Sequence, residues 1–67
     1  MKYYILKRGN YYLSEITYND KKKITNLVID TDFRKLYFDF EVAEEDRKKI
    51  FNETGLDLEI KILKEEE

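Results

Sequence analysis

The side chains most able to do chemistry form one acidic cluster. Glu44, Glu45 and Asp46 are consecutive, and Asp39 and Glu41 precede them. Paired carboxylates act as a general acid and a general base when burial raises the pKa of one of them. Here the neighbouring residues are also highly charged and have helical spacing, so we expect a solvated helix turn and no catalytic pair. The same turn is a candidate binding surface, because an acidic face fits a groove whose Lys and Arg residues respond to nucleic-acid phosphate.

A second acidic motif, Asp30-Thr31-Asp32, has a D-x-D spacing. Two carboxylates could begin a Mg²⁺ or Ca²⁺ site, but these ions require more oxygen ligands, and no loop here has EF-hand spacing. Asp and Thr side chains also bond the local backbone in turns. The motif therefore predicts a polar turn and no metal site.

The chain lacks the side chains on which most enzyme and metal chemistry depends. It contains no His and no Cys, which removes the commonest general base, the commonest transition-metal ligand and any disulfide. Ser14 has no histidine to activate it, and Gly9-Asn10 lacks the Lys-Ser/Thr pair and the following helix of a phosphate-binding loop. We therefore predict a protein that is not an enzyme, with no catalytic residue and no cofactor.

The length of 67 residues predicts a single domain over residues 1–67, with an acidic tail at 64–67 that is frayed. A chain this short buries a small core, and without disulfides or metal it would gain stability from a partner or from self-association. The apolar run near the N-terminus is too short for a signal peptide or a membrane span. We expect a cytoplasmic protein with no membrane partner.

The elements that must position these residues follow from hydrophobic spacing. Aromatic and branched residues predict strands over 3–7 and 11–18, joined by the turn residues Gly9-Asn10 in a primed hairpin. That loop predicts pairing of Leu6 with Leu13, Tyr4 with Glu15 and Tyr3 with Ile16. Leu27-Val28-Ile29 predicts an interior strand over 24–30, and alternation of Leu36, Phe38 and Phe40 with Tyr37 and Asp39 predicts a strand over 36–40.

Helical spacing follows over residues 42–53, with Ala43 and Ile50 on one stripe. Asp39 is the nearest candidate for the N-cap, and Gly55 is a natural residue to end the helix. Alternating apolar residues then predict a last strand over 56–62. The predicted order is ββββαβ, an α+β fold with a mostly antiparallel sheet and one helix packed on one face.

The first hairpin is apolar on both faces, and a single helix covers only one of them. One face carries Tyr3, Ile5, Tyr12, Ile16 and Tyr18, and the other carries Tyr4, Leu6, Tyr11 and Leu13. Either the sheet curls and covers itself, or one face is left as a contact surface. We predict a protein-binding surface made of one hairpin face and the acidic helix start: Tyr4, Leu6, Tyr11, Leu13, Glu41, Glu44, Glu45 and Asp46.

Lys21-Lys22-Lys23, with nearby tyrosines, offers a different function. Lysines contact phosphate and tyrosine rings stack on bases in proteins that bind single-stranded nucleic acid. The net charge of −2 and the pI near 5.2 argue against this alternative. We therefore expect a protein partner rather than nucleic acid.

Two parts of the chain have a familiar layout: Lys2-Tyr3-Tyr4-Ile5 with Tyr11-Tyr12-Leu13, and Ala43-Glu44-Glu45 through Thr54-Gly55-Leu56. In these stretches and in its length, the chain resembles small proteins encoded by phages and other mobile elements. Some such proteins, including anti-CRISPR proteins, inhibit host defence by binding a nuclease complex through an acidic face. The resemblance implies that function but no specific residue. Two alternatives stay open: a self-associating module that pairs edge strands in a homodimer, and a designed domain.

Overall fold

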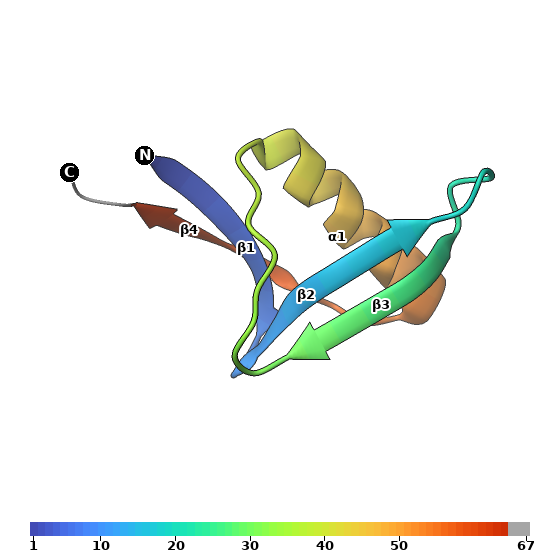
Figure 1. Cartoon of the computed structure of the whole chain (residues 1–67), viewed down its shortest axis with the longest axis horizontal. Helices are drawn as coiled ribbons and strands as arrows, with labels where there is room; N and C mark the ends of the chain where they lie inside the picture. Colours follow the sequence, from blue (N-terminus) through green and yellow to red (C-terminus); the bar gives the residue numbers. More distant parts are fainter. Residues whose placement is uncertain (65–67) are drawn as a thin grey trace.

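The computed structural model describes residues 1–64 as one four-stranded sheet with one helix (Figure 1). The elements are β1 (Lys2–Arg8), β2 (Tyr11–Tyr18), β3 (Ile24–Asp30), α1 (Phe40–Thr54) and β4 (Glu59–Lys64). All strand pairs are antiparallel, in the spatial order β3-β2-β1-β4. The predicted α+β class is confirmed, although the order along the chain is βββαβ and not ββββαβ.

The turn between β1 and β2 is the two-residue turn that the sequence predicts. Gly9 has a φ of 60°, a left-handed conformation that costs glycine little. Arg8 pairs with Tyr11 and Lys7 pairs with Tyr12 across the turn. The register next to the turn is therefore the predicted one.

Beyond this turn β1 and β2 diverge, and residues 31–39 run between them (Figure 1). The backbone N–H of Tyr37 donates to the carbonyl of Tyr4 at 2.9 Å, and the N–H of Tyr4 donates back at 2.8 Å. On the other side, the N–H of Lys35 donates to the carbonyl of Leu13 at 2.7 Å. Because this segment occupies the gap, the predicted pairs further from the turn do not form: Leu6 with Leu13, Tyr4 with Glu15 and Tyr3 with Ile16.

The prediction of a strand over residues 36–40 is wrong. Only Tyr37 makes a β-bridge there, and α1 already begins at Phe40. The alternation exists, but its buried face is the opposite one: Tyr37 is 4% exposed, whereas Leu36 and Phe38 are 45% and 65% exposed. The reason is that the Tyr37 hydroxyl reaches a hydrogen-bond acceptor on α1, so the whole phenol is buried with its polar group satisfied.

β3 has the predicted bounds but lies at an edge of the sheet, so the prediction of an interior strand is wrong. Its apolar run is explained by packing, since Ile24, Leu27 and Ile29 contact the core from this edge. Two irregularities interrupt its register with β2, between Leu13 and Glu15 and between Thr17 and Tyr18. Such bulges bend and twist a strand pair.

The helix begins and ends at the residues that its capping chemistry favours. The Asp39 side chain accepts a hydrogen bond from the Glu41 N–H at 2.9 Å, which satisfies one of the unpaired donors at the helix start. Gly55 has a φ of 80° and its N–H donates to the Phe51 carbonyl. The helix is thus three residues longer than the predicted 42–53, two at its start and one at its end.

The core lies between α1 and one face of the sheet. It contains apolar side chains and one tyrosine, all nearly inaccessible to solvent: Leu6, Leu13, Tyr37, Ala43, Ile50 and Leu58. Leu58 precedes β4, which runs six residues and ends at Lys64 rather than at the predicted residue 62. Lys64 therefore belongs to a strand and is not frayed, while the rest of the predicted tail, residues 65–67, lies outside the described residues. Within residues 1–64, no helix has the length and apolar character needed to cross a membrane.

The burial pattern of α1 gives a stability prediction. Ile50→Ala removes a fully buried side chain and should lower the free energy of unfolding by about 2–5 kcal/mol. The neighbouring Phe51 is 50% exposed, so Phe51→Ala is the matched control and should cost less than half as much. Urea denaturation followed by circular dichroism measures both. Equal losses would contradict the placement of the helix on the sheet.

Candidate functional site

The acidic cluster contains one carboxylate that is fully engaged inside the fold. The Tyr18 hydroxyl donates to Oδ1 of Asp46, and the Tyr37 hydroxyl donates to Oδ2, both at 2.5 Å. Tyr18 ends β2, Tyr37 lies in the segment between β1 and β2, and Asp46 is in the second turn of α1. Charge-assisted bonds from hydroxyls to a carboxylate are short and strong. This Tyr18–Asp46–Tyr37 node therefore ties the helix to both halves of the sheet.

The environment of the node keeps both phenols protonated. Burial raises the pKa of Tyr37 far above its usual value, and the hydrogen bond to Asp46 and the negative charge of that carboxylate raise it further. The pKa of Tyr18 is raised by the same causes in the same order. Both tyrosines are thus hydrogen-bond donors at neutral pH. The arrangement stabilises structure and supplies no ionised tyrosine for nucleophilic or base chemistry.

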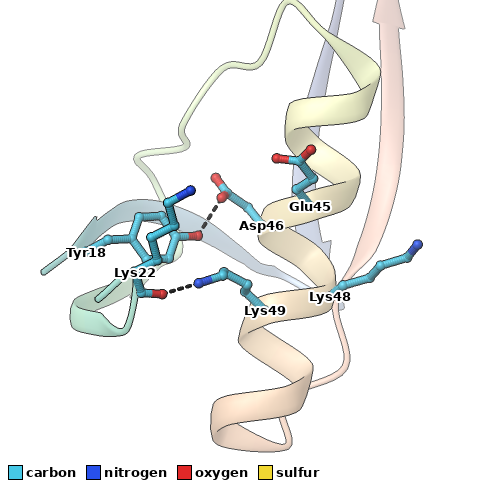
Figure 2. A pocket seen from close by; sticks show the side chains of 6 residues that line it. All are labelled: Tyr18, Lys22, Glu45, Asp46, Lys48 and Lys49. Carbon is cyan, nitrogen blue, oxygen red and sulfur yellow. Dashed lines mark hydrogen bonds between the residues drawn. The ribbon is translucent and has the colours of Figure 1, made fainter. Parts of the chain in front are cut away.

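A shallow hollow of about 540 Å³ lies beside the node, between the end of β2 and the outer side of α1 (Figure 2). The Lys49 ammonium lies 5.0 Å from the centre of the Tyr18 ring, a cation–π distance. Lys49 also donates to the backbone carbonyl of Lys22, whose φ of 61° is unusual for a non-glycine residue. Tyr18 and Lys49 are occupied within the fold, which leaves Lys22, Glu45 and Lys48 at the rim of the hollow.

The predicted acidic surface divides into paired and unpaired residues. Glu44 accepts two hydrogen bonds from the Arg47 guanidinium, at 2.5 and 3.2 Å, and these bonds lower the pKa of the Glu44 carboxyl. Asp46 is engaged in the node. Glu41 and Glu45 are exposed and form no ion pair within residues 1–64. Two of the four predicted acidic contact residues are therefore available to a partner.

The predicted hairpin contact face is the face that α1 covers. Leu6 and Leu13 are fully buried in the core, so the prediction that they contact a partner is wrong. Tyr4 is half-buried and its ring meets Phe40 edge-on at 5.5 Å. Only Tyr11 is exposed, at 57%, near the turn. The reason is that alternation along β1 fixes two faces but does not tell which of them a distant helix will cover.

The opposite face of the sheet is the surface that sequence reasoning missed. Because Tyr4 and Tyr37 are paired and lie on the helix side, the residues next to them lie on the other side. Tyr3 and Phe38 meet there with their ring centres 6.4 Å apart. We call this surface the helix-free face, and it comprises Tyr3, Tyr12, Leu36, Phe38 and Leu63. Ile5 lies on the same side of β1 but is only 1% exposed, so it is not part of the surface.

The D-x-D motif forms the predicted polar turn, in which the Asp32 N–H donates to Oδ1 of Asp30 at 3.0 Å. Within the part of the chain that the structure describes, no group of three or more His, Cys, Asp or Glu residues could hold a metal ion. The lysine run is also part of a turn. The Asn19 side chain accepts hydrogen bonds from the backbone N–H groups of Lys21 and Lys23, at 2.9 and 3.0 Å.

The node gives a prediction about stability. Tyr37→Phe removes the hydroxyl that bonds Asp46 and should lower the free energy of unfolding by about 1.5–3 kcal/mol, the range for a hydrogen bond to a charged group. Asp46→Asn should remove part of the same interaction. A double-mutant cycle by urea denaturation should then give a coupling above ~0.5 kcal/mol between the two changes. Additive losses would show that the bond does not contribute to stability.

The same node gives a prediction about alkaline pH. Because the folded pKa of Tyr18 and Tyr37 is above the unfolded value of about 10, their contribution to stability is present below pH 10 and is lost as the pH rises above it. In an absorbance titration, two of the six tyrosines should ionise only as the chain unfolds. The Tyr18→Phe/Tyr37→Phe double variant should lose less stability between pH 10 and 12. Ionisation of all six before unfolding would contradict the prediction.

Comparison with known proteins adds no relative to this picture. No family model, no curated protein and no solved structure matches the chain. The resemblance to phage-encoded and anti-CRISPR proteins therefore stays a prediction, and functional inference rests on the surfaces described above.

Proposed function

We propose that the chain is a small non-enzymatic protein-binding module that contacts its partner through the helix-free face. One observation supports the proposal most: Leu36 and Phe38 are 45% and 65% exposed, although their neighbours Lys35 and Tyr37 hold the segment by backbone hydrogen bonds to β2 and β1. Apolar side chains on a held backbone lose little entropy on binding, so they suit an interface. Phe33, at 72% exposure, extends the apolar surface of the same segment.

The charges around this face favour a partner of opposite sign. Lys7 pairs with Tyr12 of β2, and Lys61 pairs with Ile5 of β1, so both lysines lie on the helix-free side of the sheet. The Arg34 guanidinium lies 4.2 Å from the centre of the Tyr12 ring. The carboxylate of Glu59 is 3.7 Å from the Lys7 ammonium. The partner that best complements this surface is a protein with an apolar centre and an acidic rim, because opposite potentials speed association and select the orientation.

Inhibition of a nuclease complex, the function that the resemblance implies, would use an acidic surface instead. Glu41 and Glu45 are the carboxylates of the helix start that face solvent without an ion pair among the described residues. They lie on α1, away from the helix-free face. An inhibitor of that kind would therefore use α1 as a second surface, and charge reversal there separates the two modes of binding.

Single-stranded nucleic acid is the competing ligand for the helix-free face. Exposed aromatic rings next to Lys and Arg form the stacking surface of such binders. The net charge of −2 disfavours a polyanion. We therefore propose a protein partner, and the test below includes nucleic acid as an outcome.

A photo-reactive phenylalanine analogue at position 38 tests the proposal. It should crosslink to a protein in lysate of the source cells, whereas the same analogue at position 51 of α1, where Phe51 is 50% exposed, should not. The affinity of the captured protein for Phe38→Ala should fall by more than about tenfold, as expected for an aromatic anchor at the centre of an interface. Phe51→Ala should bind as the unchanged chain does.

Three outcomes would contradict this function. Crosslinks to nucleic acid at position 38, removed by nuclease, would favour the competing ligand. Equal crosslinking at positions 38 and 51 would indicate non-specific apolar contact. Loss of binding on charge reversal of Glu41 and Glu45, with Phe38→Ala unaffected, would place the interface on α1.

A further inference from the structure

We infer that the chain forms a two-fold symmetric homodimer in which the free edge of β4 pairs antiparallel with β4 of a second copy, centred on Ile60. This interface is formed by the edge of β4, beside the helix-free face, and does not depend on the function proposed above. The second copy is identified as the occupant by the charges along β4, which complement themselves in one register.

The free edge of β4 is more regular than the other edge of the sheet. β4 pairs with β1 over residues 59–64 without interruption, and within residues 1–64 no strand pairs with its outer side (Figure 1). At the opposite edge, β3 is bulged, and the Ile24 N–H donates to the Glu53 side chain of α1 at 3.0 Å. Bulges and covering groups protect an edge from pairing with other chains. β4 has neither device.

Charge selects a single register for pairing of β4 with itself. Residues directly opposite each other in two paired strands point to the same side of the sheet. A two-fold axis normal to the sheet must therefore place one residue of β4 opposite the same residue of the second copy, and each register is named by this central residue. Centred on Ile60, Glu59 lies opposite Lys61 of the second copy, and the symmetry makes this pair twice. Centred on Lys61, two lysines face each other, and centred on Ile62, Lys61 faces Leu63. Of these three registers, only the first pairs opposite charges, so edge lysines, which usually discourage pairing, here specify it.

Apolar side chains next to this edge would be covered by the same arrangement. Ile62 and Phe40 are 53% and 47% exposed, and with Ile60 and Arg47 they line a groove of about 460 Å³ between α1 and β4. In the register centred on Ile60, Ile62 lies opposite Leu58 of the second copy. The helices of both copies then lie on the same side of one continuous sheet, with the order β3-β2-β1-β4-β4-β1-β2-β3.

Sedimentation equilibrium of the whole chain tests the dimer. The mass should rise from 8.2 kDa towards twice that value as the concentration rises to ~1 mM, the weak range expected for a small interface. Glu59→Lys and Lys61→Glu each place like charges opposite each other at both symmetric pairs, so each variant should dimerise about tenfold more weakly. Mixing the two variants should restore dimers of the mixed kind, because every pair is then of opposite charge.

Mixing also separates association from folding. Glu59→Lys removes the intrachain contact with Lys7, but exposed ion pairs contribute little to stability. If that loss were the cause of weaker association, the second variant would not repair it. Circular dichroism of each variant should be unchanged.

Single cysteines measure the register directly, because the chain has none of its own. A disulfide across the two-fold axis requires Cα atoms within about 7 Å. Ile60→Cys should therefore form an oxidised dimer, whereas Lys61→Cys and Ile62→Cys should not. Lys61→Cys is on the exposed side of β4 and is the matched control for reactivity.

Three results would overturn the inference. A monomeric mass at ~1 mM would exclude the dimer. A dimer that crosslinks through position 61 or 62 and not through position 60 would exclude the register, as would charge variants that dimerise as well as the unchanged chain. None of these results bears on crosslinking from position 38, so failure of this inference and failure of the proposed function are distinguishable.

Discussion

The fold depends on how Tyr37 is held between two diverging strands. Its backbone pairs with Tyr4 of β1, and its phenol crosses to the Asp46 carboxylate on α1, which also accepts the hydroxyl of Tyr18 from β2. A buried hydroxyl needs a partner, and here that partner is a charged group whose other oxygen is also engaged. One carboxylate therefore fixes the position of the helix relative to both halves of the sheet. The node thus connects the segment between the strands, the helix and, through the buried Tyr37, the core.

The same constraint creates the surface that we assign to binding. Neighbouring residues of an extended segment point to opposite sides, so burial of Tyr37 leaves Leu36 and Phe38 exposed. Leu36 and Phe38 are exposed to solvent while Tyr37, which carries a polar group, is buried, and this is the reverse of the usual preference for burying apolar residues. The arrangement is stable because the Tyr37 hydroxyl has a hydrogen-bond partner inside the protein. The apolar surface outside is thus a cost of the fold that a partner could offset.

The sequence predicted the features that local chemistry determines. The Gly9-Asn10 turn, the bounds of β3 and the end of α1 at Gly55 follow from short-range rules about φ, alternation and capping. The wrong predictions were those of which face is buried, both in the hairpin and in residues 36–40. Period-two patterns are symmetric in their faces, and the deciding partner, Asp46, lies nine residues away from Tyr37 on a different element. From the sequence, its carboxylate resembles solvated surface because the two residues before it and the three after it are all charged.

The helix-free face and the β4 edge adjoin each other, so a dimer formed at the edge would affect binding at the face. Leu63 and Lys61 lie on the same side of β4, through their pairing with Tyr3 and Ile5, and Lys61 also belongs to the pairing edge. A two-fold axis normal to the sheet would place two helix-free faces side by side on one surface. A partner that offers two sites would then bind the second face as an intramolecular event, with higher avidity and no new contact. Dimerisation through the edge would therefore strengthen a weak small interface, which a 67-residue module otherwise lacks the area to improve.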